Sequence, residues 1–185
     1  MRLFIAIDID DEEVCYKAYT IQRLLVDSGV IGTYPSRDQL HITLKFLGET
    51  PEYKLSSINA SLSKISVDGE VLLRISGVGA FPSLKRPRVV FLDVDGNDKL
   101  YSLQSTIEKE MVKLGFRKED RPFKPHITIY RVKRPWTWKD SLSRELSSID
   151  IGKTLSINEF KLKESVLTSS GPIYKDIYVY SLGGR

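Results

Sequence analysis

His41-Ile42-Thr43-Leu44 and His126-Ile127-Thr128-Ile129 are nearly the same four-residue stretch, written twice in a chain of 185 residues. They contain the only two histidines of the chain, 85 positions apart. In each stretch apolar and polar residues alternate, which is typical of a half-buried β-strand whose residues i and i+2 share a face. We therefore expect two similar strands, each of which buries aliphatic side chains and presents an imidazole beside a hydroxyl.

Strict alternation also predicts which polar side chains accompany each histidine. These faces would hold His41, Thr43 and Lys45 in the first strand, and His126, Thr128 and Tyr130 in the second. Two such strands in one small domain could face each other across a cleft and form one active site with paired imidazoles. The alternative is a structural repeat left by duplication, but this does not easily explain why both polar faces kept a His and a Thr.

Composition restricts the class of protein. The net charge is +4 and the pI is about 9.0, which favours a polyanionic partner without proving one. A single cysteine, Cys15, cannot form an internal disulfide, so we expect a reducing compartment. The apolar start of the chain, residues 3–7, is too short for a signal peptide, and no apolar run is long enough for a membrane span. We expect a cytoplasmic protein that does not bind membranes.

Periodicity and turn residues predict the order of the elements. The expected helices are residues 11–27, a segment begun by Thr50-Pro51, residues 100–114, and a stretch from Pro135 in which Trp136 and Trp138 pack. The expected strands are residues 3–9, 41–48, 70–80, 88–95 and 126–132, followed by a hairpin of 153–167 and 175–182. The two halves match in kind, which favours an α+β fold with two lobes whose antiparallel sheets line a shared groove.

A facing pair of histidines supports acid–base chemistry, because neutral and protonated imidazole coexist near neutral pH. A neighbouring threonine hydroxyl can bind a phosphoryl oxygen. No cluster of His, Cys or Glu with metal-ligand spacing accompanies the histidines, and the chain lacks a G-x-S-x-G elbow, a P-loop and a Rossmann glycine pattern. Metal-independent attack on a phosphodiester remains, with cationic side chains stabilising the phosphate oxygens.

The paired motifs resemble those of the 2H phosphoesterase superfamily, together with Phe81-Pro82, Pro87-Arg88 and Gly171-Pro172-Ile173-Tyr174. Within it the chain is most similar to the RNA 2′,3′-cyclic phosphodiesterases, also called the 2′-5′ RNA ligase family. The resemblance spans nearly the whole chain. It implies one bilobal α+β domain over residues 1–185, in which two pseudo-twofold-related lobes place antiparallel sheets along a central cleft and helices outside. It implies hydrolysis of an RNA-terminal 2′,3′-cyclic phosphate to a 2′-phosphate, with 2′-5′ joining of RNA ends as a second activity, and no metal or nucleotide cofactor.

The same resemblance implies roles for individual residues. His41 would donate a proton to the leaving 3′ oxygen, His126 would accept one from water, and Thr43 and Thr128 would hold the phosphate. Arg131 stands where the family carries a phosphate-binding arginine, although strict alternation would turn it to the apolar face. A bulge or a strand end must therefore reorient it. Lys45, Tyr130 and Phe81 are further candidates for substrate binding, the two aromatic rings by stacking on a terminal base.

Two other functions fit the same residues. A non-catalytic RNA-binding module could use the basic loops at 85–88 and 117–124, and a 2H phosphoesterase could act on a small cyclic nucleotide instead of RNA. In each case we expect a monomer, and partners that are RNA ends or nucleotides with a 2′,3′-cyclic phosphate.

Overall fold

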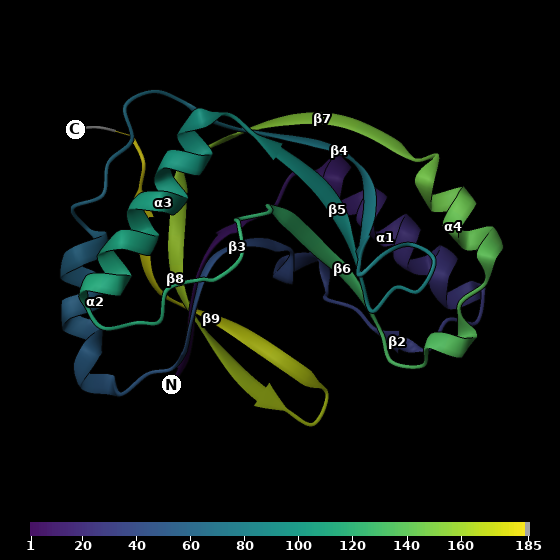
Figure 1. Ribbon diagram of the computed structural model, residues 1–185, viewed down its shortest axis with the longest axis horizontal. Coiled ribbons are helices and arrows are strands. Elements are labelled where there is room, and N and C mark those ends of the chain that lie inside the picture. Colours follow the sequence, from purple (N-terminus) through teal and green to yellow (C-terminus); the bar gives the residue numbers. More distant parts are fainter. Residues whose placement is uncertain (184–185) are drawn as a thin grey trace.

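The two histidine strands lie side by side but belong to two different antiparallel sheets in this computed structural model, which describes residues 1–183 (Figure 1). The first sheet has the strand order β3-β1-β8-β9. Its strands are β1 (Arg2–Asp8), β3 (His41–Glu49), β8 (Glu159–Thr168) and β9 (Gly171–Ser181). The second sheet has the order β2-β6-β5-β4-β7. Its strands are β2 (Gly32–Thr33), β4 (Val71–Phe81), β5 (Val89–Gly96), β6 (His126–Val132) and β7 (Asp150–Ile157).

Four α-helices flank the sheets, with α2 and α3 at one side of the molecule and α1 and α4 at the other (Figure 1). They are α1 (Glu12–Asp27), α2 (Leu55–Leu62), α3 (Asp98–Lys113) and α4 (Asp140–Ser147), with 3₁₀ turns η1 (Arg37–Gln39), η2 (Glu52–Lys54) and η3 (Pro135–Thr137). The two long helices begin at capping side chains: Asp11 accepts from the Val14 amide and Asn97 from the Leu100 amide. After α3, Gly115 takes a φ of +84°, the left-handed conformation that glycine adopts without strain.

The register of the strands reveals the internal repeat. Asp8 pairs with His41 across β1 and β3, and Asp93 pairs with His126 across β5 and β6. In each pair the histidine is the first residue of its strand and faces an aspartate of the neighbouring strand, so the repeat includes that neighbouring strand as well as the histidine motif. The two lobes are therefore related structural units, as the sequence predicted.

The helices connect the lobes to each other. Helix α1 follows β1 of the first sheet but packs against β6 and β7 of the second. Helix α3 follows β5 of the second sheet and packs against β3 of the first as well as against its own sheet. Each histidine strand is consequently supported by a helix that comes from the other half of the chain.

Most expected elements are confirmed, and three expectations are wrong. Residues 153–167 do not form one strand, because β7 ends at Ile157 in the second sheet and β8 begins at Glu159 in the first. Thr50 does not cap a helix; its hydroxyl donates to the Gly48 carbonyl, and α2 begins only at Leu55. Trp136 does not pack, since its side chain is 76% exposed. Within residues 1–183, no helix combines the length and the hydropathy needed to span a membrane.

Candidate active site

Both histidine rings are held by the same main-chain hydrogen bond. The Nδ1 atom of His41 lies 2.8 Å from the carbonyl oxygen of Gln39, and Nδ1 of His126 lies 2.8 Å from that of Lys124. A carbonyl oxygen can only accept, so Nδ1 carries the proton in each ring. This bond sets the tautomer and leaves Nε2 of both histidines as the atom that can accept or donate a proton to a substrate.

Each imidazole also stands against two aromatic rings. Phe4 and Tyr174 lie 5.2 and 5.1 Å from the His41 ring, and Tyr174 meets it nearly perpendicularly, at 86°. Phe91 and Phe81 lie 5.2 and 5.0 Å from His126, and Phe81 meets it at 89°. The second lobe thus repeats the arrangement of the first. In both lobes the aromatic rings restrict the motion of the imidazole and partly exclude water from it.

A β-bulge interrupts β3 directly after the His-x-Thr motif. Ala6 of β1 pairs with Thr43 and the preceding Ile5 pairs with Lys45, so Leu44 has no partner. The extra residue reverses the alternation. Lys45 therefore turns to the face of the buried Ile5, while Phe46 turns to the face of His41 and Thr43 and is 67% exposed there.

The same bulge occurs in β6. Phe91 pairs with Thr128 and Val90 with Tyr130, so Ile129 is the unpaired residue. Because of this bulge Arg131 lies on the face of His126 and Thr128, and it is exposed. The reorientation that the sequence required for Arg131 is confirmed.

The prediction that Lys45 and Tyr130 share a face with the histidines is wrong for both residues. Lys45 is 4% exposed, and its Nζ lies 2.8 Å from Glu108 of α3 and 2.9 Å from the Arg117 carbonyl. Tyr130 is 1% exposed and its hydroxyl donates to the Val30 carbonyl at 2.7 Å. Both side chains are buried between sheet and helix, where they have polar partners and cannot reach a substrate.

Two glutamines hold the bulges from the helices of the opposite lobe. Gln22 of α1 donates to the carbonyl oxygen of Ile129, at 3.0 Å, and also to that of Pro35. Gln104 of α3 donates to the carbonyl oxygen of Leu44, at 3.3 Å. In both strands the bulged residue is thus the one whose carbonyl is bound by a side chain from across the lobe boundary. Sequence periodicity gave no signal for either glutamine.

The pKa of each histidine is lowered from its ordinary value of 6.5, chiefly because burial disfavours the charged imidazolium. The main-chain bond from Nδ1 opposes this shift in both rings by favouring the protonated form. The positive charge of Arg131 lowers the pKa of both His41 and His126. Strands β3 and β6 also contact each other, so the two histidine strands adjoin.

A network of ion pairs continues the His41 face across the first sheet. Lys163 Nζ lies 2.8 Å from Asp8 and 2.6 Å from Asp176, and Lys161 contacts the same two carboxylates. Burial alone would lower the pKa of Lys161, but its bonds to Asp176 and Asp8 raise it. These lysines are therefore neutralised by carboxylates, which distinguishes them from Arg131.

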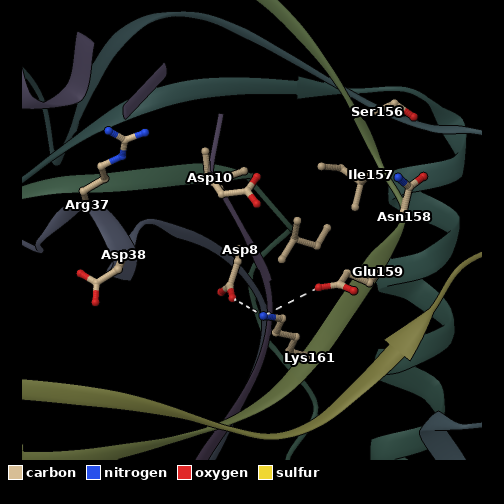
Figure 2. Close-up of a pocket in the computed structure, with 11 residues that line it drawn as sticks. Asp8, Asp10, Arg37, Asp38, Ser156, Ile157, Asn158, Glu159 and Lys161 are labelled. Carbon is tan, nitrogen blue, oxygen red and sulfur yellow. Dashed lines mark ion pairs between the residues drawn. The ribbon is translucent and has the colours of Figure 1, made fainter. Parts of the chain in front are cut away.

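A cavity of about 800 Å³ lies beside this network, and neither histidine lines it. Figure 2 shows Lys161 reaching toward Asp8 and Glu159 at its edge, with Asp10, Arg37 and Asp38 from other segments. Acidic side chains outnumber basic ones in its lining, so this cavity does not favour an anionic substrate. Within residues 1–183, no group of three or more His, Cys, Asp or Glu side chains is placed to hold a metal ion.

The structure therefore brings together part of the predicted set. His41, Thr43, His126, Thr128 and Arg131 lie on the matching faces of β3 and β6, and Phe81 lies against His126. Phe4, Phe46, Phe91 and Tyr174 belong to the same surroundings and were not predicted as site residues. Tyr174 stands in the motif Gly171-Pro172-Ile173-Tyr174, so the sequence contained a signal that this residue belongs to the site. Phe46 could be predicted as a neighbour of the histidine only with knowledge of the bulge.

Comparison with known proteins identifies relatives of the whole arrangement. A family model described as the 2′-5′ RNA ligase superfamily matches residues 28–164. A protein of Archaeoglobus fulgidus named RNA 2′,3′-cyclic phosphodiesterase is 40% identical over 97% of this chain and 99% of its own. A Thermotoga maritima protein of the same name is 38% identical over 96% of this chain and 94% of its own.

Solved structures show the same fold. A crystal structure of a Thermus thermophilus protein superposes with a TM-score of 0.82 at 28% identity, covering 98% of each chain. The crystal structure of Escherichia coli LigT complexed with 3′-AMP superposes with a TM-score of 0.75 at 23% identity, covering 99% of this chain and 98% of LigT. The two-lobed arrangement of the sheets is common to this chain and these structures.

Proposed function

Because this chain belongs to the 2′-5′ RNA ligase superfamily, we propose that it is an enzyme that hydrolyses the 2′,3′-cyclic phosphate at an RNA end to a 2′-phosphate. The observation that carries this function is the pair of equivalent imidazoles, His41 and His126, each with Nδ1 bound to a carbonyl and Nε2 free. The relatives named RNA 2′,3′-cyclic phosphodiesterase match nearly the full length of the chain.

The reaction follows from two proton transfers, one from the oxygen that bonds to the phosphorus atom and one to the oxygen that leaves it. Nε2 of His126 accepts a proton from water as the water oxygen bonds to phosphorus, and Nε2 of His41 donates a proton to the 3′ oxygen as its bond to phosphorus breaks. The products are a 2′-phosphate and a free 3′ hydroxyl. The hydroxyls of Thr43 and Thr128 bind the phosphate oxygens, and the guanidinium of Arg131 stabilises their negative charge.

The lowered pKa values suit this cycle. With both imidazoles less basic than usual, His126 is neutral near pH 7 and ready to accept a proton. The acid must be protonated, and a bound phosphodiester anion favours that state because an opposite charge raises a histidine pKa. Substrate binding thus supplies the proton donor, while the fold supplies the base. The mechanism requires no metal ion, and the family resemblance implies none.

Substitution of the histidines tests the mechanism. His41→Ala and His126→Ala should each lower turnover of a 2′,3′-cyclic phosphate-ended RNA by roughly 10²–10⁴-fold, the usual contribution of one positioned proton transfer. Circular dichroism and thermal unfolding provide the control that both variants fold. Near-normal turnover by either folded variant would exclude the paired mechanism.

Activity should also survive EDTA. A loss of activity in EDTA that zinc restores would favour a metallohydrolase instead.

The wider biology is part of the same proposal. We propose that residues 1–185 act as one bilobal domain, because α1 and α3 each support the histidine strand of the opposite lobe. We also propose a cytoplasmic monomer whose single thiol, Cys15, stays reduced and buried. Joining of RNA ends would use the same residues in the same roles. A 5′ hydroxyl of RNA takes the place of water: it gives its proton to His126 and bonds to phosphorus, while His41 protonates the 3′ oxygen as its bond to phosphorus breaks, which leaves a 2′-5′ linkage. Cleavage of that linkage to the cyclic phosphate exchanges the two roles. Light scattering on the purified protein tests the monomer.

A further inference from the structure

Six cationic side chains gather at one end of the second sheet. They are exposed and come from two segments: Lys85, Arg86 and Arg88 in the turn between β4 and β5, and Arg131, Lys133 and Arg134 at the end of β6. The two segments adjoin, since Val89 pairs with Arg131 and the Val132 amide donates to the Arg88 carbonyl at 2.9 Å. Figure 1 shows the end of β6 beside the turn that joins β4 and β5. We call this set the basic end of the sheet.

No ion pair of residues 1–183 involves any of these six side chains. Several basic groups elsewhere are neutralised: Arg117 pairs with Asp120, and Lys161 and Lys163 share Asp8 and Asp176. Like charges that gather without carboxylate partners repel one another and destabilise the folded state. The positive charge of the basic end is therefore available to an anion.

Two aromatic rings border the same cations. Trp136 is 76% exposed, and the guanidinium of Arg134 lies 5.9 Å from its ring centre. Tyr34 is 46% exposed and follows Thr33, which pairs with Arg131. One face of the Tyr34 ring stacks on the buried Tyr130, at 5.6 Å, so the tyrosine is held in place. Exposed aromatic rings among cations are the combination with which proteins bind single-stranded nucleic acid, through base stacking and phosphate contacts.

We propose that the basic end of the sheet, with Tyr34 and Trp136, binds the body of a single-stranded RNA whose cyclic phosphate end lies at the two histidines. The inference rests on the proposed function and adds to it the path that the RNA strand takes over the surface of the protein. Arg131 is the point of continuity, because it belongs both to the basic end and to the His126 face. Along β6 the backbone rises roughly 15 Å from His126 to Arg131. Arg88, Lys133 and Arg134 lie beyond Arg131 as seen from His126, so these cations contact nucleotides preceding the terminal one. The preferred substrate is therefore an oligonucleotide and not a mononucleotide.

The test compares two substrates on one variant. Arg88→Gln, Lys133→Gln and Arg134→Gln are combined, with Arg131 left intact because it belongs to the catalytic site. The variant should hydrolyse a 2′,3′-cyclic mononucleotide as fast as the unmodified protein, while kcat/KM for a single-stranded RNA decamer with a cyclic phosphate end falls at least tenfold. Its binding of the decamer should depend less on salt, with the slope of log K against log salt smaller by about 2, as expected when three phosphate contacts in a single strand are lost.

A matched variant and a separate stacking variant serve as controls. Lys64→Gln, Arg74→Gln and Lys109→Gln remove three exposed charges elsewhere and should leave kcat/KM for both substrates unchanged. Trp136→Ala should weaken decamer binding by about tenfold through lost stacking alone. The inference is overturned if the triple variant loses activity equally on both substrates, if it loses none, or if the matched variant loses as much. It is also overturned if the triple variant loses binding to phosphatidylserine vesicles and keeps binding to RNA.

Binding of a 5′-fluorescein-labelled RNA decamer, followed by anisotropy, separates this inference from the proposed function. If the unmodified protein turns over neither substrate, the proposed function fails, yet weaker decamer binding by the triple variant would still support the surface. If turnover is normal and the triple variant binds the decamer as tightly as the unmodified protein, the surface is refuted and the proposed function stands.

Discussion

The amide of Gln22 donates a hydrogen bond of 3.0 Å to the carbonyl oxygen of Ile129, a residue 107 positions further along the chain. Ile129 is the bulged residue of β6, and the bulge places Arg131 on the same face of the sheet as His126. We expect Gln22→Leu to lower the free energy of unfolding by about 1–3 kcal/mol, because a buried carbonyl loses its donor. It should also weaken inhibition by inorganic phosphate, since Arg131 is less firmly oriented. Thermal unfolding and a phosphate inhibition constant measure the two effects.

Gln104→Leu provides the matched comparison. It removes the corresponding bond to the Leu44 carbonyl, but the residue that this bulge turns outward is Phe46 and not a cation. The variant should lose stability and keep its affinity for phosphate. Equal loss of phosphate affinity in both variants would mean that the glutamines act only through general stability.

Arg131 should affect the pH profile as well as the rate. Removing its charge in Arg131→Gln raises the pKa of both histidines, because that charge lowers them in the unmodified protein. Both limbs of the bell-shaped dependence of kcat/KM on pH should therefore shift to higher pH. We expect kcat/KM itself to fall by roughly 10–100-fold, the usual cost of one hydrogen bond to a charged group. A reduced rate with unmoved limbs would show that Arg131 is remote from the rings.

Burial by the neighbouring aromatic rings should control the pKa of each histidine separately. Phe81→Ala admits water to His126 and should raise its pKa toward 6.5 without changing that of His41. Tyr174→Ala should do the converse, because Tyr174 contacts His41. The proton resonances of the two imidazoles, followed through a pH titration, measure both values. Movement of both histidines in either variant would contradict this separation of the lobes.

Lys45 should be needed for stability but not for catalysis. Lys45→Ala leaves the partly buried Glu108 without its cation, although the Glu119 amide still donates to it, and should cost about 1–3 kcal/mol of unfolding free energy. Lys45→Met with Glu108→Leu replaces both charges by apolar groups and should restore most of that loss. The double variant should keep normal kcat/KM per folded molecule. A large loss of activity in this double variant would contradict the prediction and indicate that Lys45 contributes to substrate binding.

The comparison of sequence and structure turns on the bulges. Alternation correctly assigned the faces of His41, Thr43, His126 and Thr128, because the strands are regular over those residues. It failed one step later, at Lys45 and Tyr130, where an extra residue reverses the pattern. A bulge depends on a partner strand and, here, on a glutamine from a distant helix, so local periodicity cannot reveal it.

Long-range packing explains the other differences. The apolar stripe of α1 predicted a helix but not that it would pack on β6 of the opposite lobe. Asn158 separates β7 from β8, and nothing in the polarity of residues 153–167 indicates that the chain passes there from one sheet to the other. By contrast, the family resemblance outweighed the parity of the strand for Arg131, and the bulge does place this residue on the face of His126; its binding of phosphate stays a prediction.

The central claim is that His41 and His126 act on a single phosphorus atom, and a titration of their two imidazoles tests it most directly. The chain has only two histidines, so each gives one resolvable ring signal. Inorganic phosphate should shift both signals with one common dissociation constant and a stoichiometry of one phosphate per chain, and should raise both pKa values. Two different dissociation constants, or a response from only one ring, would contradict the claim.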